Sequence, residues 1–530
     1  MPPHFSLDEL ALALKRVEQD HKYRVFVTRP AEWAVVDAQR EAWLSRLRAQ
    51  IESGSYVPGP APIADVPKGK GAVRSACLLS LTDEVVYTAA VGRLVSAIQS
   101  ALEWGKPHPD CSYLLRKPDG VNWVSTPYLC YKIWRERSVE SLAVPVHFVV
   151  VTDITAYYDT ILHEILLSDL KAAGAEAELA SYLVGKLLSR WVVVNGRGIP
   201  QGLSASDLLA KLYLNTIDHG LSGAGVVHLR YVDDMRLFCN SLADARTALL
   251  LLQSLLRHRG LALQSAKTQM LRPDKARVVF DGIQPVLAPL AKKFTASIAK
   301  AAGLESDYLH PAEAAKLLAA LKAPPTDLLT DAYRAYLMAE DADFNKTLFR
   351  YLIGQLGRAK DSFALAHSIS LLLDHPEETT AILAYVERTE LVAESDAAIL
   401  DRLLAAESVY PYQHYQFLRW RLHQSAAPSD DLLKYARDVS TASRSPAYLR
   451  SAGRLFLGKF GTAADLEQMK STYASADSDA ARIEIVCALQ RMENGQRNAF
   501  YGQLVRDGPM VAAAVQLVKR SGLQIGAPAL

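Results

Sequence analysis

Three aspartates stand where their side chains could bind divalent metal ions. Asp153 follows the β-branched run at residues 147–151 in HFVVVTDI, which predicts a buried strand that ends at this carboxylate. Asp233 and Asp234 are adjacent in LRYVDDMRLFC, between two apolar arms that are typical of a β-hairpin. We therefore expect the two adjacent acids at the turn of this hairpin.

The chemistry expected of these three carboxylates is phosphoryl transfer. Adjacent acids repel each other, and a third carboxylate nearby adds to the cost of ionising them. Divalent ions bound through carboxylates and substrate phosphates remove this cost, and a pair of such ions activates an attacking hydroxyl and stabilises the leaving oxygen. An isolated Asp-Asp pair is more often a solvated turn, but the apolar arms beside Asp233 and Asp234 disfavour that interpretation.

Five short motifs occur around these aspartates in an order that resembles the reverse transcriptases. Residues 231–234 (YVDD) resemble the metal-binding palm motif of that family, and residues 153–159 (DITAYYD) resemble its first palm motif. The other three are 198–206 (GIPQGLSAS), 263–268 (LQSAKT), and the fingers segment made of 56–58 (YVP) and 67–74 (PKGKGAVR). Five motifs in order are far more specific than any one of them.

The resemblance implies how a deoxynucleoside triphosphate (dNTP) is bound. Asp153, Asp233 and Asp234 are implied to be catalytic and to hold two Mg²⁺ ions, or Mn²⁺, with Asp234 as a ligand or as a neighbour that orients the site. The residues implied to contact the dNTP are Lys68, Lys70, Arg74, Tyr158, Gln201 and Lys267.

The physical roles of these dNTP contacts differ. Arginine binds phosphate as a bidentate fork and lysine as a point charge, while the ring of Tyr158 is implied to exclude a ribose 2′-hydroxyl by its bulk. Gln201 and the following Gly202 are implied to let the backbone approach the template base, because glycine has no side chain. A solvated Gly-rich loop is the alternative for Lys68 and Lys70, and a core aromatic is the alternative for Tyr158.

Two kinds of sequence follow each other along the chain. Up to about residue 290, helical patterns mix with short β-branched runs, of which HFVVVTDI, WVVVNG, VVHLRYVDDMRLF and ARVVF are the clearest. From about residue 295 these runs give way to short Ala- and Leu-rich helical segments, spaced compatibly with HEAT-like repeats of roughly 40 residues. With the resemblance, this predicts an α+β right-hand polymerase (fingers and palm, residues 1–295) followed by an all-α HEAT-like helical-repeat domain (296–530). A compact helical bundle is the alternative for the second half.

The helical second half narrows the resemblance. We find no segment like an RNase H domain, a maturase region or the VTG motif of retrons. The long helical array after the palm resembles that of bacterial abortive-infection and other defence-associated reverse transcriptases. Residues 111–116 (CSYLLR) resemble a Ser-Tyr-Arg element of those enzymes, although Leu114 stands where arginine is typical. This resemblance implies a role in anti-phage defence and DNA synthesis with or without a template. It also implies priming on a protein tyrosine, which the sequence does not identify; the candidates are Tyr410, Tyr412, Tyr415, Tyr473 and Tyr501.

The partners expected from the resemblance are dNTPs, an RNA template or folded noncoding RNA, and the DNA product. RNA would be recognised mostly by shape and phosphate contacts, and a homo-oligomer is expected as in related enzymes. A different class, an RNA-binding scaffold whose catalysis is incidental, has no need of three carboxylates at these positions. An intron-type or retron-type reverse transcriptase is the other alternative, and it is disfavoured because we find none of the domains that follow the palm in those enzymes.

Bulk composition leaves these alternatives open. The formal net charge of +2 neither requires nor excludes nucleic acid, because binding depends on where the charge lies. The five scattered cysteines contain no CxxC pair and are expected to be buried thiols rather than a zinc site. No window is apolar enough for a membrane helix, and the first residues are charged where a signal peptide would be apolar. A cytoplasmic protein without a membrane partner is expected.

Overall fold

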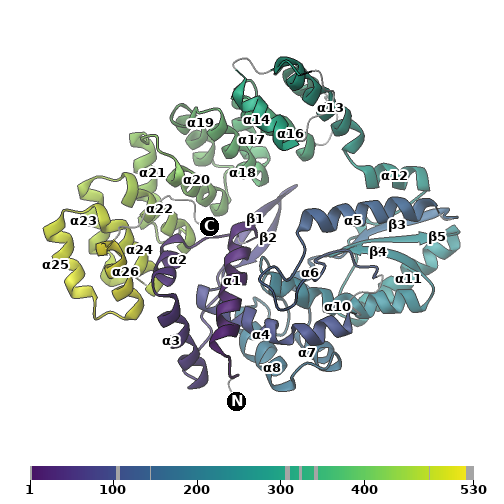
Figure 1. Ribbon diagram of the computed structural model, residues 1–530, viewed down its shortest axis with the longest axis horizontal. Helices are drawn as coiled ribbons and strands as arrows, with labels where there is room; N and C mark the ends of the chain where they lie inside the picture. Colours follow the sequence, from purple (N-terminus) through teal and green to yellow (C-terminus); the bar gives the residue numbers. More distant parts are fainter. Residues whose placement is uncertain are drawn as a thin grey trace.

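The chain folds into an α+β region followed by a long array of helices (Figure 1). The computed structural model describes residues 3–24, 26–102, 108–143, 145–304, 311–321, 325–338, 344–476 and 478–520. Within these ranges every strand lies before residue 272. The predicted change from mixed structure to helices alone is therefore confirmed for the part of the chain that the structure describes.

A four-stranded antiparallel sheet forms the base of the palm. Its strand order is β4 (Val227–Tyr231), β5 (Asp234–Cys239), β3 (Phe148–Asp153) and β6 (Gln269–Leu271). The predicted strand before Asp153 and the predicted hairpin around Asp233 are both confirmed. Because β3 pairs directly with β5, the end of β3 lies beside the tip of the β4–β5 hairpin.

Helices cover both faces of this sheet, and the strands are accordingly apolar on both sides. On one face, α10 (Ser204–Gly223) and α11 (Leu242–His258) pack over a core that includes Val150 and Leu237. On the other face, α5 (Pro127–Glu140) and α12 (Pro273–Asp281) pack over Val149 and Phe238. Neighbouring residues of one strand thus enter different cores, as the pleat requires.

Two predicted strands are wrong. Residues 276–280 (ARVVF) belong to α12, because Pro273 begins a helix and the buried residues Ala276 and Phe280 are four positions apart, while both valines between them are exposed. The segment WVVVNG leaves a helix at Trp191 and forms a short turn, in which Val193 is 77% exposed. The helix start at Pro273 decided the structure of the first segment, and the turn after Trp191 decided that of the second. In both, β-branched composition was the weaker signal.

The fingers carry a two-stranded antiparallel hairpin of β1 (Ile63–Gly69) and β2 (Ala72–Cys77). Its tip needs backbone with positive φ at Gly69, Lys70 and Gly71, which explains the two glycines on either side of the lysine. The other elements of this half are α1 (Leu7–Tyr23), α2 (Pro30–Ala38), α3 (Arg40–Glu52), α4 (Leu81–Ala101), η1 (Ser141–Ala143), α6 (Tyr157–Thr160), α7 (His163–Ala172), α8 (Ala177–Tyr182), η2 (Leu183–Leu188), α9 (Ser189–Trp191) and η3 (Ser265–Lys267).

The helical array runs as an arc from α13, above the palm, to the last helices beside α2 (Figure 1). Successive even-numbered helices from α16 to α26 pack against each other, and α17, α19 and α21 form a second row. The elements are α13 (Gln284–Ala301), α14 (Pro311–Ala320), α15 (Asp327–Leu337), α16 (Lys346–Arg358), α17 (Leu365–Asp374), η4 (Pro376–Glu378), α18 (Thr379–Arg388), α19 (Val392–Leu404), α20 (Pro411–His423), α21 (Asp430–Thr441), α22 (Ala447–Phe460), α23 (Ala463–Ser471), η5 (Tyr473–Ser475), α24 (Asp479–Ala488), η6 (Leu489–Arg491), α25 (Asn494–Leu504) and α26 (Pro509–Arg520). A HEAT-like repeat remains a prediction.

The array and the N-terminal half share a hydrophobic core. Val27, Ala64 and Ala76 belong to the same buried cluster as the apolar faces of the array helices. The predicted domain boundary at residue 295 lies within helix α13 and not in a loop. The division into two domains remains a prediction.

All five cysteines are free thiols, of which Cys77 is half-buried and the others are buried. Among the described helices, none combines the length and the apolar character needed to cross a lipid bilayer.

Candidate active site

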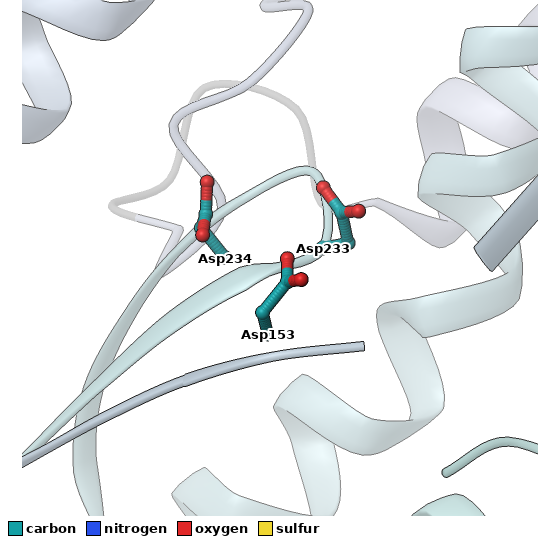
Figure 2. A group of neighbouring side chains, drawn as sticks. All are labelled: Asp153, Asp233 and Asp234. Carbon is teal, nitrogen blue, oxygen red and sulfur yellow. The ribbon is translucent and has the colours of Figure 1, made fainter. Parts of the chain in front are cut away.

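The three predicted carboxylates meet at one end of the sheet. Asp153 is the last residue of β3 and lies opposite Asp234, the first residue of β5, while Asp233 occupies the hairpin turn. One carboxylate oxygen of each lies within 4.8 Å of the others. Figure 2 shows the three side chains clustered, with Asp153 between the other two.

A buried arginine holds the turn that carries Asp233. Val232 has φ +58°, which is unusual for a β-branched residue and requires support from its surroundings. The Arg230 guanidinium donates to the Val232 carbonyl oxygen at 3.0 Å and is itself fixed by Asp218 and Asp110. The turn is thus braced from inside the palm.

The electrostatics of the triad favour a bound cation. Burial and then the charge of Asp153 raise the pKa of Asp233, although Lys68 and Lys267 partly offset this. Asp234 is open to solvent on one side, yet loss of solvation and the charges of Asp233 and Asp153 raise its pKa to about 6. Oxygen-only ligands at this spacing suit Mg²⁺ or Mn²⁺. The residues present therefore fit divalent metal ions.

The binding of Mg²⁺ is expected to depend on pH through Asp234. With a pKa of about 6, this carboxylate is mostly ionised at pH 7.5 and mostly protonated at pH 5.5. Because protons compete with the cation for the ligand, and because binding to the folded state raises stability, Mg²⁺ will raise the midpoint of thermal unfolding at pH 7.5. We expect a smaller rise at pH 5.5, measured by differential scanning fluorimetry over a Mg²⁺ titration.

The metal-free protein should show the opposite dependence of stability on pH. Between pH values of about 4 and 6 the folded state binds a proton at Asp234 that the unfolded state does not, so this carboxylate destabilises the fold above pH 6 and the penalty fades as pH falls. An Asp234→Asn variant should lack both pH effects. Equal Mg²⁺ responses of the wild type at the two pH values would contradict the assignment.

Two of the predicted lysines lie near the triad. The Lys267 ammonium pairs with the Asp153 carboxylate at 2.6 Å, and its side chain is 54% exposed. Lys68, near the tip of the β1–β2 hairpin, is close enough to stabilise ionised Asp233. These positive charges approach the triad from two different elements, the fingers hairpin and the segment before β6.

The remaining predicted dNTP contacts lie on the fingers hairpin, in the turn before α10 and in α6. Lys70 stands at the fingers hairpin tip, and Arg74 on β2 places its guanidinium 5.8 Å from the Phe26 ring centre. Gln201 is half-buried in the turn before α10. Tyr158 is 7% exposed, and its hydroxyl donates to Asp207 Oδ1 at 2.6 Å.

Four of the five candidate priming tyrosines have hydroxyls that are used inside the protein. The Tyr412 hydroxyl donates to the Phe26 carbonyl, and that of Tyr415 accepts the Thr28 amide. Within the array, Tyr473 donates to Asp507 and Tyr501 to the carbonyl of Val486. Tyr410 is half-buried, and the identity of a priming tyrosine remains open.

Sequence reasoning missed three charged residues that hold the site together: Arg24, Asp207 and Arg230. Arg24 forms an ion pair with Asp207, and Arg230 braces the turn of the hairpin. A signal was present for two of them, since Arg230 interrupts an apolar strand directly before YVDD and Asp207 lies in the first turn of a buried helix. Charged residues in such places are rarely buried without a partner.

Comparisons with known proteins agree with the motifs. Residues 66–298 match the family described as reverse transcriptase (RNA-dependent DNA polymerase). Among curated proteins, Protein YkfC of Escherichia coli (strain K12) is 25% identical over 203 residues, which are 37% of this chain and 49% of YkfC. The chain thus spans about half the length of this curated relative.

Solved structures similar to this chain include two fungal telomerases. Apo telomerase from Candida tropicalis, truncated from the C-terminal domain, has 13% identity and a TM-score of 0.31, over 44% of this chain and 55% of that one. Telomerase from Candida albicans in complex with a TWJ fragment of telomeric RNA has 11% identity and a TM-score of 0.31, over 69% and 70% of the two chains. Residues 66–298, the part that is similar to the reverse transcriptase family, contain the three aspartates and all but the first three residues of the fingers hairpin.

Proposed function

We propose that this protein is a DNA polymerase of the reverse transcriptase type that joins dNTPs by two-metal phosphoryl transfer. The observation that carries the proposal is the cluster of Asp153, Asp233 and Asp234 at the tip of the palm hairpin, with ligand atoms within 4.8 Å of one another. The raised pKa values of Asp233 and Asp234 add support, because a cluster that is costly to ionise alone becomes favourable around cations.

The chain's own residues would do the following work. Asp153, Asp233 and Asp234 would hold two Mg²⁺ ions, or Mn²⁺, which when bound supply a Lewis acid to the reacting phosphate. Lys68 on β1 and Lys267 in η3 would attract the triphosphate towards the triad. Arg230 keeps Asp233 in place by holding the turn.

The dNTP would lie between the fingers hairpin and the palm. Lys70 and Arg74 on that hairpin would neutralise phosphate charge, and Gln201 would lie beside the template base. The ring of Tyr158 would select deoxyribose by its bulk, and its hydroxyl, which donates to Asp207, fixes the ring from behind.

The proposal extends to the role that the resemblance implies. The helical array after the palm supports a place for this protein among defence-associated enzymes. In that role it would act against phage through the DNA that it makes. The template would be an RNA, which could be a folded noncoding RNA, or synthesis would need no template. Priming on a protein tyrosine and assembly into a homo-oligomer belong to the same proposal. We propose a cytoplasmic location from the sequence, which has no window apolar enough for a membrane helix.

The purified protein is expected to incorporate labelled dNTPs in the presence of Mg²⁺ or Mn²⁺. The test supplies each labelled dNTP singly and all four together, with and without added RNA template and primer, and separates the products on denaturing gels. Label that migrates with the protein after denaturation would indicate priming on a side chain, and sequencing of co-purified nucleic acid would identify a dedicated RNA.

An RNA-binding scaffold predicts a different result. It would bind RNA with similar affinity in the wild type and in an Asp233→Ala/Asp234→Ala variant, and neither would incorporate nucleotide with either ion. Absence of incorporation under all these conditions, from a protein that is folded and binds Mg²⁺, would overturn the polymerase proposal.

A further inference from the structure

The segment between α1 and α2 is tied to the helical array by two tyrosine hydroxyls. We call Arg24 and residues 26–29 the strap. The Tyr412 hydroxyl donates to the Phe26 carbonyl oxygen at 2.9 Å, and the Thr28 amide donates to the Tyr415 hydroxyl, also at 2.9 Å. Both tyrosines lie on α20, nearly 400 positions away along the chain. Both strap contacts depend on a hydroxyl group, and both phenol rings are buried.

The side of the strap that faces the palm meets residues predicted to bind the dNTP. A Cβ atom on Gly202, where φ is +108°, would lie 3.3 Å from the Phe26 ring and 3.5 Å from the Arg24 carbonyl oxygen. The turn that contains Gln201 is therefore packed directly on the strap. The Arg74 guanidinium lies over the same Phe26 ring, 5.8 Å from the ring centre.

The first residue of the strap is linked to Tyr158 through the Asp207 carboxylate. The Arg24 guanidinium pairs with Asp207 Oδ2, and Asp207 Oδ1 accepts the Tyr158 hydroxyl at 2.6 Å. Because one carboxylate bridges the two groups, a displacement of Arg24 also moves the acceptor that fixes the Tyr158 ring. Arg24 further lies over the ring of Tyr113, 5.0 Å from its centre.

The array also contacts the fingers beside the strap. Helix α20 packs on β1, and η4 reaches the tip of the β1–β2 hairpin, where a Cβ atom on Gly69 would lie 3.0 Å from Glu377 Oε1. The array therefore supports the fingers and the strap together.

We propose that Tyr412 and Tyr415 are positioning residues for the nucleotide pocket, through which the helical array sets the strap against Gly202, Arg74 and the Arg24–Asp207–Tyr158 chain. The inference rests on the proposed polymerase function. It assigns the array a part in nucleotide binding and sugar selection, and it leaves the chemical step to the triad.

The test removes only the two hydroxyls, in a Tyr412→Phe/Tyr415→Phe variant of the full chain. The KM for dNTP should rise about tenfold, which corresponds to roughly 1.4 kcal/mol, while kcat should change less than about twofold because the triad is untouched. Discrimination against ribonucleotides, measured as the ratio of kcat/KM values, should fall as the Tyr158 ring loses its fixed position. Backbone amides of the strap should exchange hydrogen faster.

A matched control is Tyr385→Phe. This buried hydroxyl on α18 also donates to one carbonyl, of Asp361, and accepts one amide, of Ala364, but lies within the array. It should lower the midpoint of thermal unfolding by a similar amount and leave KM, sugar discrimination and exchange of the strap unchanged.

The outcomes separate this inference from the proposed function. If the wild type polymerises and the double variant has the KM and discrimination of the wild type, the inference is overturned. If the wild type incorporates no dNTP, the proposed function fails. Hydrogen exchange still tests whether the two hydroxyls hold the strap: unchanged exchange of the strap in the double variant overturns the inference by itself.

Discussion

Asp153→Asn and Asp233→Asn variants will each lose dNTP incorporation by roughly a hundredfold to a thousandfold, the range seen when one preorganised charge-stabilising group is removed. Asparagine keeps the size of the side chain and one oxygen, but removes the negative charge that holds a divalent ion. The three carboxylates supply ligand atoms within 4.8 Å of one another, so each variant removes one negative ligand from the same site. Steady-state incorporation of labelled dNTP, at saturating Mg²⁺, measures the loss.

The Asp233→Asn variant should be more stable than the wild type when no divalent ion is present. Burial, and then the charges of Asp233 and Asp153, raise the pKa of Asp234 to about 6; the variant removes the larger of these two charge effects, so the penalty for ionising the triad at pH 7.5 falls. Lower activity with higher thermal stability distinguishes a functional metal site from ordinary misfolding, in which both decline. Chelated samples compared by thermal unfolding provide this measurement.

Asp274→Asn is the matched control for these variants. Asp274 is an exposed acid in the first turn of α12, which follows β6 of the same sheet, and it is outside the triad. Its variant should keep the activity and the Mg²⁺ response of the wild type. An Asp233→Asn variant that retains wild-type incorporation would contradict two-metal chemistry at this site.

The central part of the candidate active site was predictable because its signals are local. The β-branched run before Asp153 and the apolar arms around Asp233 specify a strand and a hairpin. Antiparallel pairing of β3 with β5 then brings Asp153 opposite Asp234. Motif order added the fingers hairpin, whose Lys68 is close enough to stabilise ionised Asp233, and Lys267, which pairs with Asp153.

What sequence spacing missed depends on contacts between distant segments. The bond between Tyr412 and Phe26 joins residues 386 positions apart, and no periodicity encodes such a pair. The resemblance implied priming on a tyrosine that the sequence does not identify, and the structure places the hydroxyls of two candidates, Tyr412 and Tyr415, in contacts with the strap. Similarly, the run ARVVF has strand composition, but its burial follows the helical period.

Arg230→Met is expected to cause one of the largest losses of stability of any single substitution in the palm, lowering the free energy of unfolding by about 3–5 kcal/mol. Arg230 is 1% exposed, and its guanidinium bonds to Asp218 at 2.5 Å and to Asp110 at 2.9 Å. Methionine fills a similar volume but removes the guanidinium from Asp218, which keeps the His228 imidazole as a hydrogen-bond partner at 3.2 Å. Lys211 remains to compensate Asp110. Chemical denaturation measures the loss.

The loss should depend on pH with a definite sign. Burial disfavours ionised Asp218, but Arg230 more than compensates and holds the pKa of this carboxyl well below its usual range in the wild type. The pair therefore stabilises the fold above pH 4 in the wild type. Without Arg230 the buried carboxylate is costly at neutral pH and is relieved by protonation, so the difference between variant and wild type should shrink from pH 8 to pH 5.

Arg230 should also affect the metal site, because its guanidinium donates to the Val232 carbonyl beside Asp233. Arg421→Met is the comparison: this arginine is buried to a similar degree and pairs with Asp396 through three hydrogen bonds, but it lies on α20, outside the β4–β5 hairpin. Both variants should lose a similar amount of stability, whereas only Arg230→Met should weaken the Mg²⁺-induced rise in unfolding temperature. If both variants retain the wild-type Mg²⁺ response, Arg230 contributes to stability alone, and the positive φ of Val232 must be maintained by the β4–β5 pairing on its own.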